Sequence, residues 1–428
     1  MKKTSEMKCG LIGKPLGHSY SPLIHSCLAD YEYKLIELDE NEVGSFIKSD
    51  KYDALNVTIP YKKTVMPFLD VISPEAERIG SVNTVTHLPD GRLKGDNTDY
   101  YGFSYMLDKG RIDVSGKKVL VLGSGGASMT ARTVVADRGA REVVIISRNG
   151  EDNYENIDRH ADCDIIVNTT PVGMYPNNGI SPVSPSRFSK LSGVVDMIYN
   201  PSKTALILEA EEMGIPCISG LCMLVAQAKA ASEFFTGKKI ENAKIDEITA
   251  HISFDTKNIM LIGMPGVGKT TNGRLIAQKL RRDFVDIDNE IVKRSGKSIP
   301  DIFAEQGEGG FRDIEHSVLE EFSRRSGLVI SCGGGTVTRS DNIKLMKQNS
   351  TVVFMKRDIA SLPKDGRPGR KPIKTSRAPW ERWGRSFQTG SGSCPNSFPA
   401  GRTPCKKRSR MGCAGSTRVF VPLRRRMN

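Results

Sequence analysis

Residues 119–128 read VLVLGSGGAS, which is an apolar strand that runs into a glycine-rich turn and the start of a helix. Glycines at positions 123, 125 and 126 allow a tight turn and let the backbone approach a pyrophosphate. The N-terminus of the following helix favours that negative charge. Ala127 follows the glycines, and Ser128 takes the last position of the GxGxxG pattern, so the match is incomplete. The stretch therefore predicts a Rossmann-like dinucleotide site, although a glycine-rich strand–helix turn without a ligand would look the same.

The next strand bears on which dinucleotide this site would take. NAD sites usually carry an acidic residue at the end of that strand, where it binds the ribose hydroxyls. Here EVVIISRN ends in Ser147 and Arg148. A guanidinium at this position suits the additional 2′-phosphate of NADP. An arginine exposed after a strand for no functional reason is the competing interpretation.

A second glycine loop lies at residues 259–272, IMLIGMPGVGKTTN. Gly263, Gly268, Lys269 and Thr270 form a full GxxxxGKT pattern between a strand and a helix, with Gly266 inside the loop and Thr271 after it. Backbone amides of such a loop hold nucleotide phosphates, the lysine reaches the β and γ oxygens, and Thr270 would ligate Mg²⁺. The alternative is a module that binds a nucleotide without transferring its phosphate, such as a switch or a motor.

Strand and helix patterns alternate from residue 7 to about 362, so the chain belongs to the α/β class. We expect parallel sheets with helices on both faces. Residues 221–236 have the apolar spacing of an amphipathic helix. Residues 237–257 are charged and polar, which is typical of a linker, and a new strand–helix unit begins at Ile259.

Bulk composition excludes several classes of protein. A chain of 428 residues is long enough for two or three domains. No apolar run approaches the ~18 residues that a membrane span needs, and because the first residues hold no long apolar region, we expect no secretory signal. Nine cysteines without CxxC pairs suit a reducing cytoplasm, where we expect the protein to work.

The net charge of +13 comes from one end of the chain. Residues 363–428 hold 17 of the 62 Lys and Arg residues but 2 of the 49 Asp and Glu residues. The remainder has 45 basic and 47 acidic residues, a net charge of −2. Any argument for nucleic-acid binding from charge would therefore apply to that tail alone, and we expect small-molecule substrates and no membrane or nucleic-acid partner.

Seven short motifs before residue 240 resemble those of shikimate dehydrogenase. In chain order they are GKPLGHSYSPLIH (13–25), NVTIPYK (56–62), SVNT (81–84), GDNTDYYG (95–102), NTTPVGM (168–174), DMIYNPSKT (196–204) and GLCMLVAQA (220–228). The resemblance implies NADP(H) as cofactor and Lys62 with Asp99 as the catalytic pair. It also implies that six further residues bind the ring hydroxyls and the carboxylate: Ser19, Ser21, Thr58, Asn83, Tyr199 and Gln227.

The residues after the second glycine loop resemble shikimate kinase in FVDID (284–288), FRDIE (311–315), CGGG (332–335) and KDGRP (364–368). ATP and Mg²⁺ are the implied cofactors. The resemblance implies that Asp286 helps to hold Mg²⁺. It also implies that Asp288 contacts the reacting hydroxyl and could act as its base. Arg312 would bind the substrate carboxylate, Gly333, Gly334 and Gly335 would approach the ring, and Arg367 would close over ATP.

The two resemblances imply a fusion of enzymes for successive reactions, reduction to shikimate and then its phosphorylation. A dehydrogenase with an impaired kinase-like module is the alternative. The expected boundaries are a substrate lobe at 1–100, completed by helices within 220–242, and a Rossmann-like NADP domain at 101–219. A linker at 243–257, a P-loop kinase domain at 258–368 and a basic tail at 369–428 would follow.

The tail departs from the kinase pattern after Arg367. It has no apolar periodicity and is rich in Pro, Gly, Ser and Arg, so we expect it to be irregular and disordered. Arg377 is the one candidate in it for a second substrate arginine. The sequence favours an out-of-frame segment that replaces the kinase C-terminus. A basic extension that binds anionic surfaces and a divergent lid on a working kinase are the other interpretations.

Overall fold

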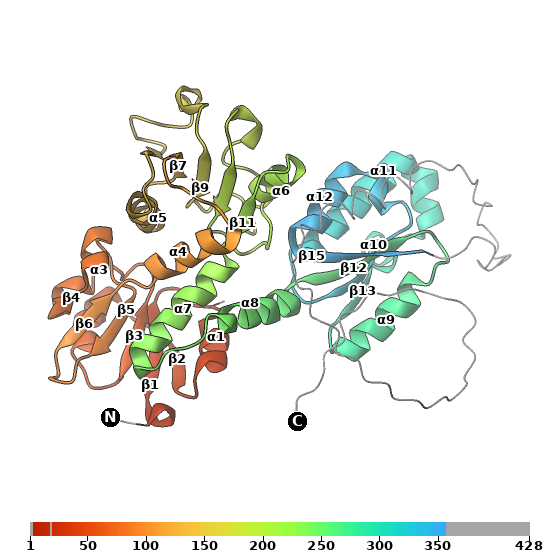
Figure 1. The fold of residues 1–428 in the computed structure, drawn as a ribbon. Coiled ribbons are helices and arrows are strands. Elements are labelled where there is room, and N and C mark those ends of the chain that lie inside the picture. The colour runs from red at the N-terminus through yellow and green to blue at the C-terminus, as the bar shows by residue number, and fades with distance from the viewer. Residues whose placement is uncertain (1–2, 18, 357–428) are drawn as a thin grey trace, which may run out of the picture. The chain divides into compact units, whose positions relative to one another are not determined.

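The computed structural model describes residues 3–17 and 19–356, which are drawn in colour in Figure 1. The chain divides into two compact units, Met1–Thr256 and Lys257–Asn428. Arg367, Arg377 and the tail from residue 369 lie outside the described residues. Within the described ranges, no helix is both long enough and apolar enough to cross a membrane.

The first unit begins with a six-stranded sheet in the order β2-β1-β3-β5-β6-β4. Its strands are β1 (Lys8–Gly13), β2 (Glu32–Glu37), β3 (Ala54–Val57), β4 (Val71–Ile72), β5 (Thr84–His87) and β6 (Leu93–Asp96). The helices of this part are α1 (Ser21–Leu28), α2 (Glu40–Ile47) and α3 (Pro74–Ile79). Alternate strands and helices here match the expected α/β pattern.

This sheet is mixed, which differs from the parallel sheet expected for this part. β5 runs antiparallel to both β3 and β6. Residues 88–92 (LPDGR) close a short hairpin between β5 and β6, in which the Leu88 N–H donates to the Arg92 carbonyl at 2.8 Å. Such a short connection joins only antiparallel neighbours, because a parallel crossover needs a dozen or more residues.

A five-stranded parallel sheet follows, in the order β11-β10-β9-β7-β8. Its strands are β7 (Lys118–Leu122), β8 (Glu142–Ile146), β9 (Ile165–Asn168), β10 (Gly193–Asp196) and β11 (Cys217–Ser219). Three helices accompany it: α4 (Asp99–Gly110), α5 (Gly126–Asp137) and α6 (Ala205–Glu212).

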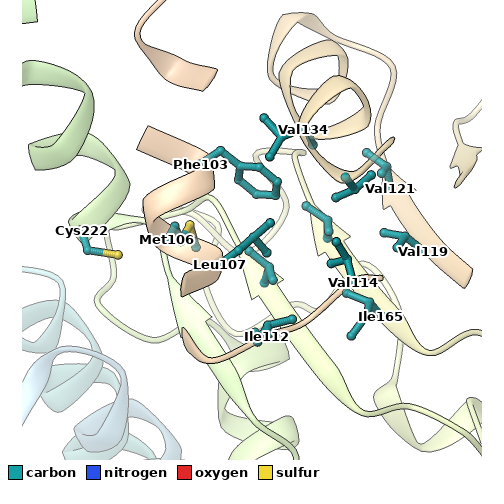
Figure 2. Close-up of a cluster of buried hydrophobic side chains, with 14 residues drawn as sticks. Phe103, Met106, Leu107, Ile112, Val114, Val119, Val121, Val134, Ile165 and Cys222 are labelled. Carbon is teal, nitrogen blue, oxygen red and sulfur yellow. The ribbon is translucent and has the colours of Figure 1, made fainter. Parts of the chain in front are cut away.

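Every residue of β7 is buried, because helices cover both faces of this sheet. Val119 and Val121 point to one face, where Phe103 and Leu107 of α4 and Val134 of α5 pack against the sheet (Figure 2). The alternate residues of β7, Leu120 and Leu122, pack on the opposite face, in a cluster that includes side chains of α6. This two-sided core holds the glycine turn that follows β7 in place.

Two further helices complete the first unit: α7 (Leu221–Thr236) and α8 (Ala243–Thr256). The segment expected to be a linker, 243–257, is helical over most of its length, because α8 covers residues 243–256 of it. The helix is mostly polar but contains three buried isoleucines, Ile245, Ile248 and Ile252. They pack in a cluster with residues of α1 and α7. Their i, i+3, i+7 spacing makes one apolar stripe on a helix whose other residues are mostly polar or charged.

The second unit has a four-stranded parallel sheet in the order β13-β14-β12-β15. Its strands are β12 (Asn258–Gly263), β13 (Phe284–Asp286), β14 (Val329–Ser331) and β15 (Ser350–Met355). The helices are α9 (Lys269–Leu280), α10 (Ile287–Ser295), α11 (Ile299–Ser323) and α12 (Ser340–Asn349). Gly307 lies inside α11 with φ 71°, and this non-helical residue kinks the helix.

Candidate active sites

Lys62, in the turn after β3, forms a pair with Asp99, at the start of α4. The Lys62 Nζ donates to the Asp99 Oδ2 at 2.6 Å. The two side chains are 28% and 19% exposed, so the pair is shielded but open to a ligand. Asp99 begins α4, and its backbone N–H donates to the Asn97 Oδ1 at 3.1 Å, which fixes the start of that helix.

The pair lines a cavity of about 850 Å³ in the first unit. Eight residues that the sequence nominated as catalytic or substrate-binding line this one cavity: Ser19, Ser21, Thr58, Lys62, Asn83, Asp99, Tyr199 and Gln227. Gly126 and Ala127 of the glycine turn also line it, whereas Gly123, Gly125, Ser147 and Arg148 do not. The cavity therefore brings the predicted polar groups beside the N-terminus of α5.

Buried amides hold the polar floor of this cavity. The Asn83 Oδ1 accepts from the Thr98 N–H at 2.7 Å and from the Thr98 hydroxyl at 3.1 Å. Asn56 is also buried, accepts from the Tyr33 hydroxyl at 2.8 Å and donates to the Asn83 carbonyl at 3.3 Å. Because each amide has hydrogen-bond partners on other segments of the chain, its side chain is held before any ligand arrives.

The glycine turn after β7 has the geometry that the sequence predicted. Gly123 has φ 104°, and a Cβ on it would come within 2.9 Å of the Thr169 Oγ1. A Cβ on Gly125 or Gly126 would meet nothing within 4 Å, so the backbone there faces open space. These two observations fit a turn that a large group can approach closely. Ser147 follows β8 directly, and Arg148 beside it is exposed.

Sequence reasoning missed part of the cavity wall. Met197, Met223 and Leu224 add apolar side chains to its lining. It also missed Asp196, which is fully buried at the end of β10. Burial raises the pKa of Asp196 to about 6. The signal available in the sequence was an acidic residue that directly follows the apolar run GVV.

The loop after β12 forms the core of the second site. Gly263, Gly266 and Gly268 all have positive φ, at 142°, 81° and 94°, which only glycine adopts readily. The buried Lys269 Nζ donates to the carbonyls of Gly263 and Met264, at 2.8 and 3.1 Å. The Thr270 hydroxyl donates to the Asp286 Oδ2 at 2.8 Å. Thr271 follows in the first turn of α9.

Four charged side chains gather near this loop. Arg312 donates to the buried Glu315 carboxylate at 2.7 Å. Burial raises the pKa of Asp288, and the neighbouring carboxylates of Asp286 and Glu315 raise it further. A raised pKa makes Asp288 a stronger base than an ordinary aspartate.

The glycines after β14 lie against these charged groups. A Cβ on Gly333 would come within 2.8 Å of carboxylate oxygens of Asp288 and Glu315. A Cβ on Gly334 would press on Pro265, and one on Gly335 would clash with the Arg312 guanidinium. A side chain at any of these positions would displace the groups that it meets, so glycine here permits close approach and is not set by backbone conformation.

Among the described residues, no group of three or more His, Cys, Asp or Glu side chains is arranged to hold a metal. In nucleotide sites, Mg²⁺ is usually bound by one or two protein oxygens together with phosphates and water. Thr270 and Asp286 are the residues in position to supply such oxygens.

The first unit has the features of a nucleotide-dependent dehydrogenase: a Rossmann-like sheet, a mixed sheet and a lysine–aspartate pair in one cavity. A P-loop unit follows it in the chain. The family model for the shikimate dehydrogenase substrate binding domain matches residues 11–85, and the model for shikimate kinase matches residues 265–383. A shikimate dehydrogenase (NADP(+)) of Clostridium perfringens is 37% identical over 260 residues, which cover 56% of this chain and 96% of that protein. The chain belongs to the shikimate dehydrogenase family and carries a shikimate kinase domain after it, as the motifs predicted.

Solved structures agree with this assignment. The chorismate mutase/shikimate 5-dehydrogenase fusion protein from Clostridium acetobutylicum is 37% identical, with a TM-score of 0.55, and the match covers 58% of this chain and 97% of that chain. Shikimate 5-dehydrogenase from Thermus thermophilus, solved with NADP(H) and shikimate, is 29% identical, with a TM-score of 0.53, over 57% of this chain and 99% of that chain.

Proposed function

We propose that the first unit catalyses the NADP-dependent reduction of 3-dehydroshikimate to shikimate. The observation that carries this proposal is the Lys62–Asp99 pair, at 2.6 Å, in one cavity with six polar groups suited to a hydroxylated ring acid. The identity to a shikimate dehydrogenase over nearly its whole length supports the same substrate.

Different residues of the cavity would have different roles in the reduction. When bound, NADPH supplies the hydride that the carbonyl carbon receives. Lys62 donates a proton to the carbonyl oxygen as negative charge develops on it, and Asp99 holds the ammonium group toward that oxygen. Ser19, Ser21 and Asn83 hydrogen-bond the ring substituents and keep the carbonyl against Lys62.

The preference for NADP depends on Arg148. Gly125 and Gly126 present open backbone at the N-terminus of α5, which suits the pyrophosphate. Ser147 and Arg148 follow β8, the neighbour of β7, where the adenosine ribose of such a cofactor would lie. The residues that directly follow β8 include no acidic side chain of the kind that favours NAD, and the exposed guanidinium would pair with a 2′-phosphate.

For the second unit we propose the ATP-dependent phosphorylation of shikimate to shikimate 3-phosphate. The contact of Thr270 with Asp286 at 2.8 Å supports a shared Mg²⁺ site beside Lys269. Asp288, whose pKa is raised, would accept the proton of the reacting hydroxyl, and Arg312 would pair with the substrate carboxylate. Positioning and charge neutralisation are the main requirements of phosphoryl transfer.

Two assays on the full chain test both proposals. One follows NADPH formation from shikimate and NADP⁺, and the other follows ADP release from ATP, Mg²⁺ and shikimate. Activity in both is the expected result. Dehydrogenase activity alone would favour the alternative, in which the second unit binds a nucleotide or shikimate but is impaired as a catalyst. No oxidation of shikimate would reject the first proposal.

A further inference from the structure

The carboxylate of Asp196 joins several loops at one edge of the five-stranded sheet. It lies at the end of β10 and is fully buried. Its Oδ1 accepts from the Asn168 side-chain amide and from the Ile198 N–H, each at 3.0 Å. Its Oδ2 accepts from the Thr204 hydroxyl at 2.6 Å. In the described part of the chain, no ion pair to this carboxylate is found.

Each of these donors holds a different loop. Asn168 ends β9, and its Oδ1 accepts from the N–H and the hydroxyl of Thr170, at 3.0 and 2.7 Å. Thr204 caps the N-terminus of α6. Ile198 lies between Met197 and Tyr199, and both of these line the cavity of the Lys62–Asp99 pair.

Further hydrogen bonds connect segment 197–199 to another residue that lines the cavity. The Ile198 carbonyl accepts from the Gly220 N–H at 3.0 Å, and the Asn168 carbonyl accepts from the Met197 N–H at 3.0 Å. Gly220 also lines the cavity, and any side chain on it would clash with the Met197 backbone. The segment 197–199 is therefore held from both sides, and the carboxylate of Asp196 ties it to β9 and α6.

Burial of a carboxylate without a cationic partner is costly, and only its three donors offset that cost. The group lies at the carboxyl edge of the sheet, which is where a ligand binds in folds of this kind. We propose that Asp196 is a positioning residue that sets segment 197–199 against the reacting ends of the substrate and cofactor. This inference rests on the proposed dehydrogenase activity.

Asp196→Asn is the direct test, because the amide keeps the shape but replaces one acceptor by a donor. With folding verified by circular dichroism and thermal melting, kcat/KM for shikimate should fall about ten- to a hundredfold. The deuterium isotope effect on kcat, with shikimate labelled at the carbon that loses hydride, should rise, because misplacement slows the hydride step itself. Loss of stability alone would leave that isotope effect unchanged.

Asp164→Asn is the matched control. Asp164 precedes β9 at the opposite edge of the same sheet and accepts from the Lys118 N–H at 2.9 Å. Its kcat/KM and isotope effect should stay within about twofold of the wild type. Equal losses in both variants, or a folded Asp196→Asn variant with normal kinetics, would overturn the inference.

Thr204 provides a second test if Asp196→Asn does not fold. Thr204→Val removes one donor from the carboxylate and should lower kcat/KM about threefold with a raised isotope effect, whereas Thr204→Ser should behave as the wild type. Identical kinetics of the two variants would also overturn the inference. An active wild type with unaffected variants rejects the positioning role alone, whereas a wild type that does not oxidise shikimate rejects the proposed function and this role with it.

Discussion

At the scale of single residues, the pairing of Lys62 with Asp99 is the contact on which the proposed reduction depends. Lys62→Ala should lower kcat by about 10²–10⁴-fold, because the developing alkoxide loses its proton donor. Thermal stability should change little, since the pair is partly exposed. Lys109→Ala is the control, because Lys109 pairs with Asp246 at 2.8 Å on the surface outside the cavity. Near-normal turnover by Lys62→Ala would reject the mechanism.

Arg148 is a second residue with a defined test. Arg148→Ala should raise KM for NADP⁺ about tenfold and leave the kinetics with NAD⁺ almost unchanged, because only NADP⁺ carries the phosphate that the guanidinium would bind. Steady-state kinetics with both cofactors measure this difference. Equal efficiency of the wild type with both cofactors would remove the claim of NADP preference.

Asp196 and His25 should change the free energy of unfolding of the first unit with pH in opposite directions. Burial raises the pKa of Asp196 to about 6, so the folded state binds its proton more tightly than the unfolded state. Stability from this group therefore falls as pH rises from about 4 to about 6. Burial lowers the pKa of His25 to about 3, so its contribution falls as pH drops below about 6.5.

Asp196→Asn should remove the first slope and leave the second. Midpoints of urea-induced loss of near-ultraviolet dichroism, taken from about pH 4 to about pH 7, should then rise more steeply with pH in the variant than in the wild type. Parallel curves for the two proteins would show that the Asp196 carboxyl does not titrate in this window.

At the scale of elements, α8 shows that the burial of three isoleucines can dock a helix whose composition is mostly polar. Ile248 is 2% exposed, and Ile248→Ala should destabilise the first unit by about 2–4 kcal/mol through lost burial and a cavity. Lys244 is a matched surface position on the same helix, paired with Glu247 at 3.1 Å. Lys244→Ala should stay within about 0.5 kcal/mol. The urea midpoint for loss of dehydrogenase activity measures both, and equal effects would contradict the docking of α8.

The parallel sheet after residue 117 was predictable because its strands are continuous apolar runs between glycine and polar turns. The antiparallel β5 and the helix α8 were not. β5 is too short to show a direction, and its pairing depends on the hairpin at 88–92. The apolar stripe of α8 needs the surfaces of α1 and α7 to become buried.

At the scale of the whole molecule, the chain carries two glycine-rich loops, one in each compact unit. Lys269→Ala should lower ATP turnover about a hundredfold or more, because the ammonium no longer reaches the phosphates, and dehydrogenase kinetics should not change. Lys62→Ala should give the reverse pattern. The NADPH and ADP assays, run on each variant, measure both activities, and coupled losses in either variant would contradict two separate sites.

The sequence by itself determined the two glycine loops, because each is encoded in a few consecutive residues with fixed conformational needs. The alternation of strand and helix patterns determined the α/β class, and the family resemblance named the polar groups of the first cavity. The family resemblance implied the pairing of Lys62 with Asp99, and the tertiary structure shows the contact itself and the cavity in which these groups meet. The contact between Lys62 and Asp99 spans 37 positions. Those between Asp196 and Asn168, or between Arg312 and the glycines after β14, likewise join separate elements. Burial, and with it the raised pKa of Asp196, depends on how sheets and helices pack around a side chain, which no local pattern specifies.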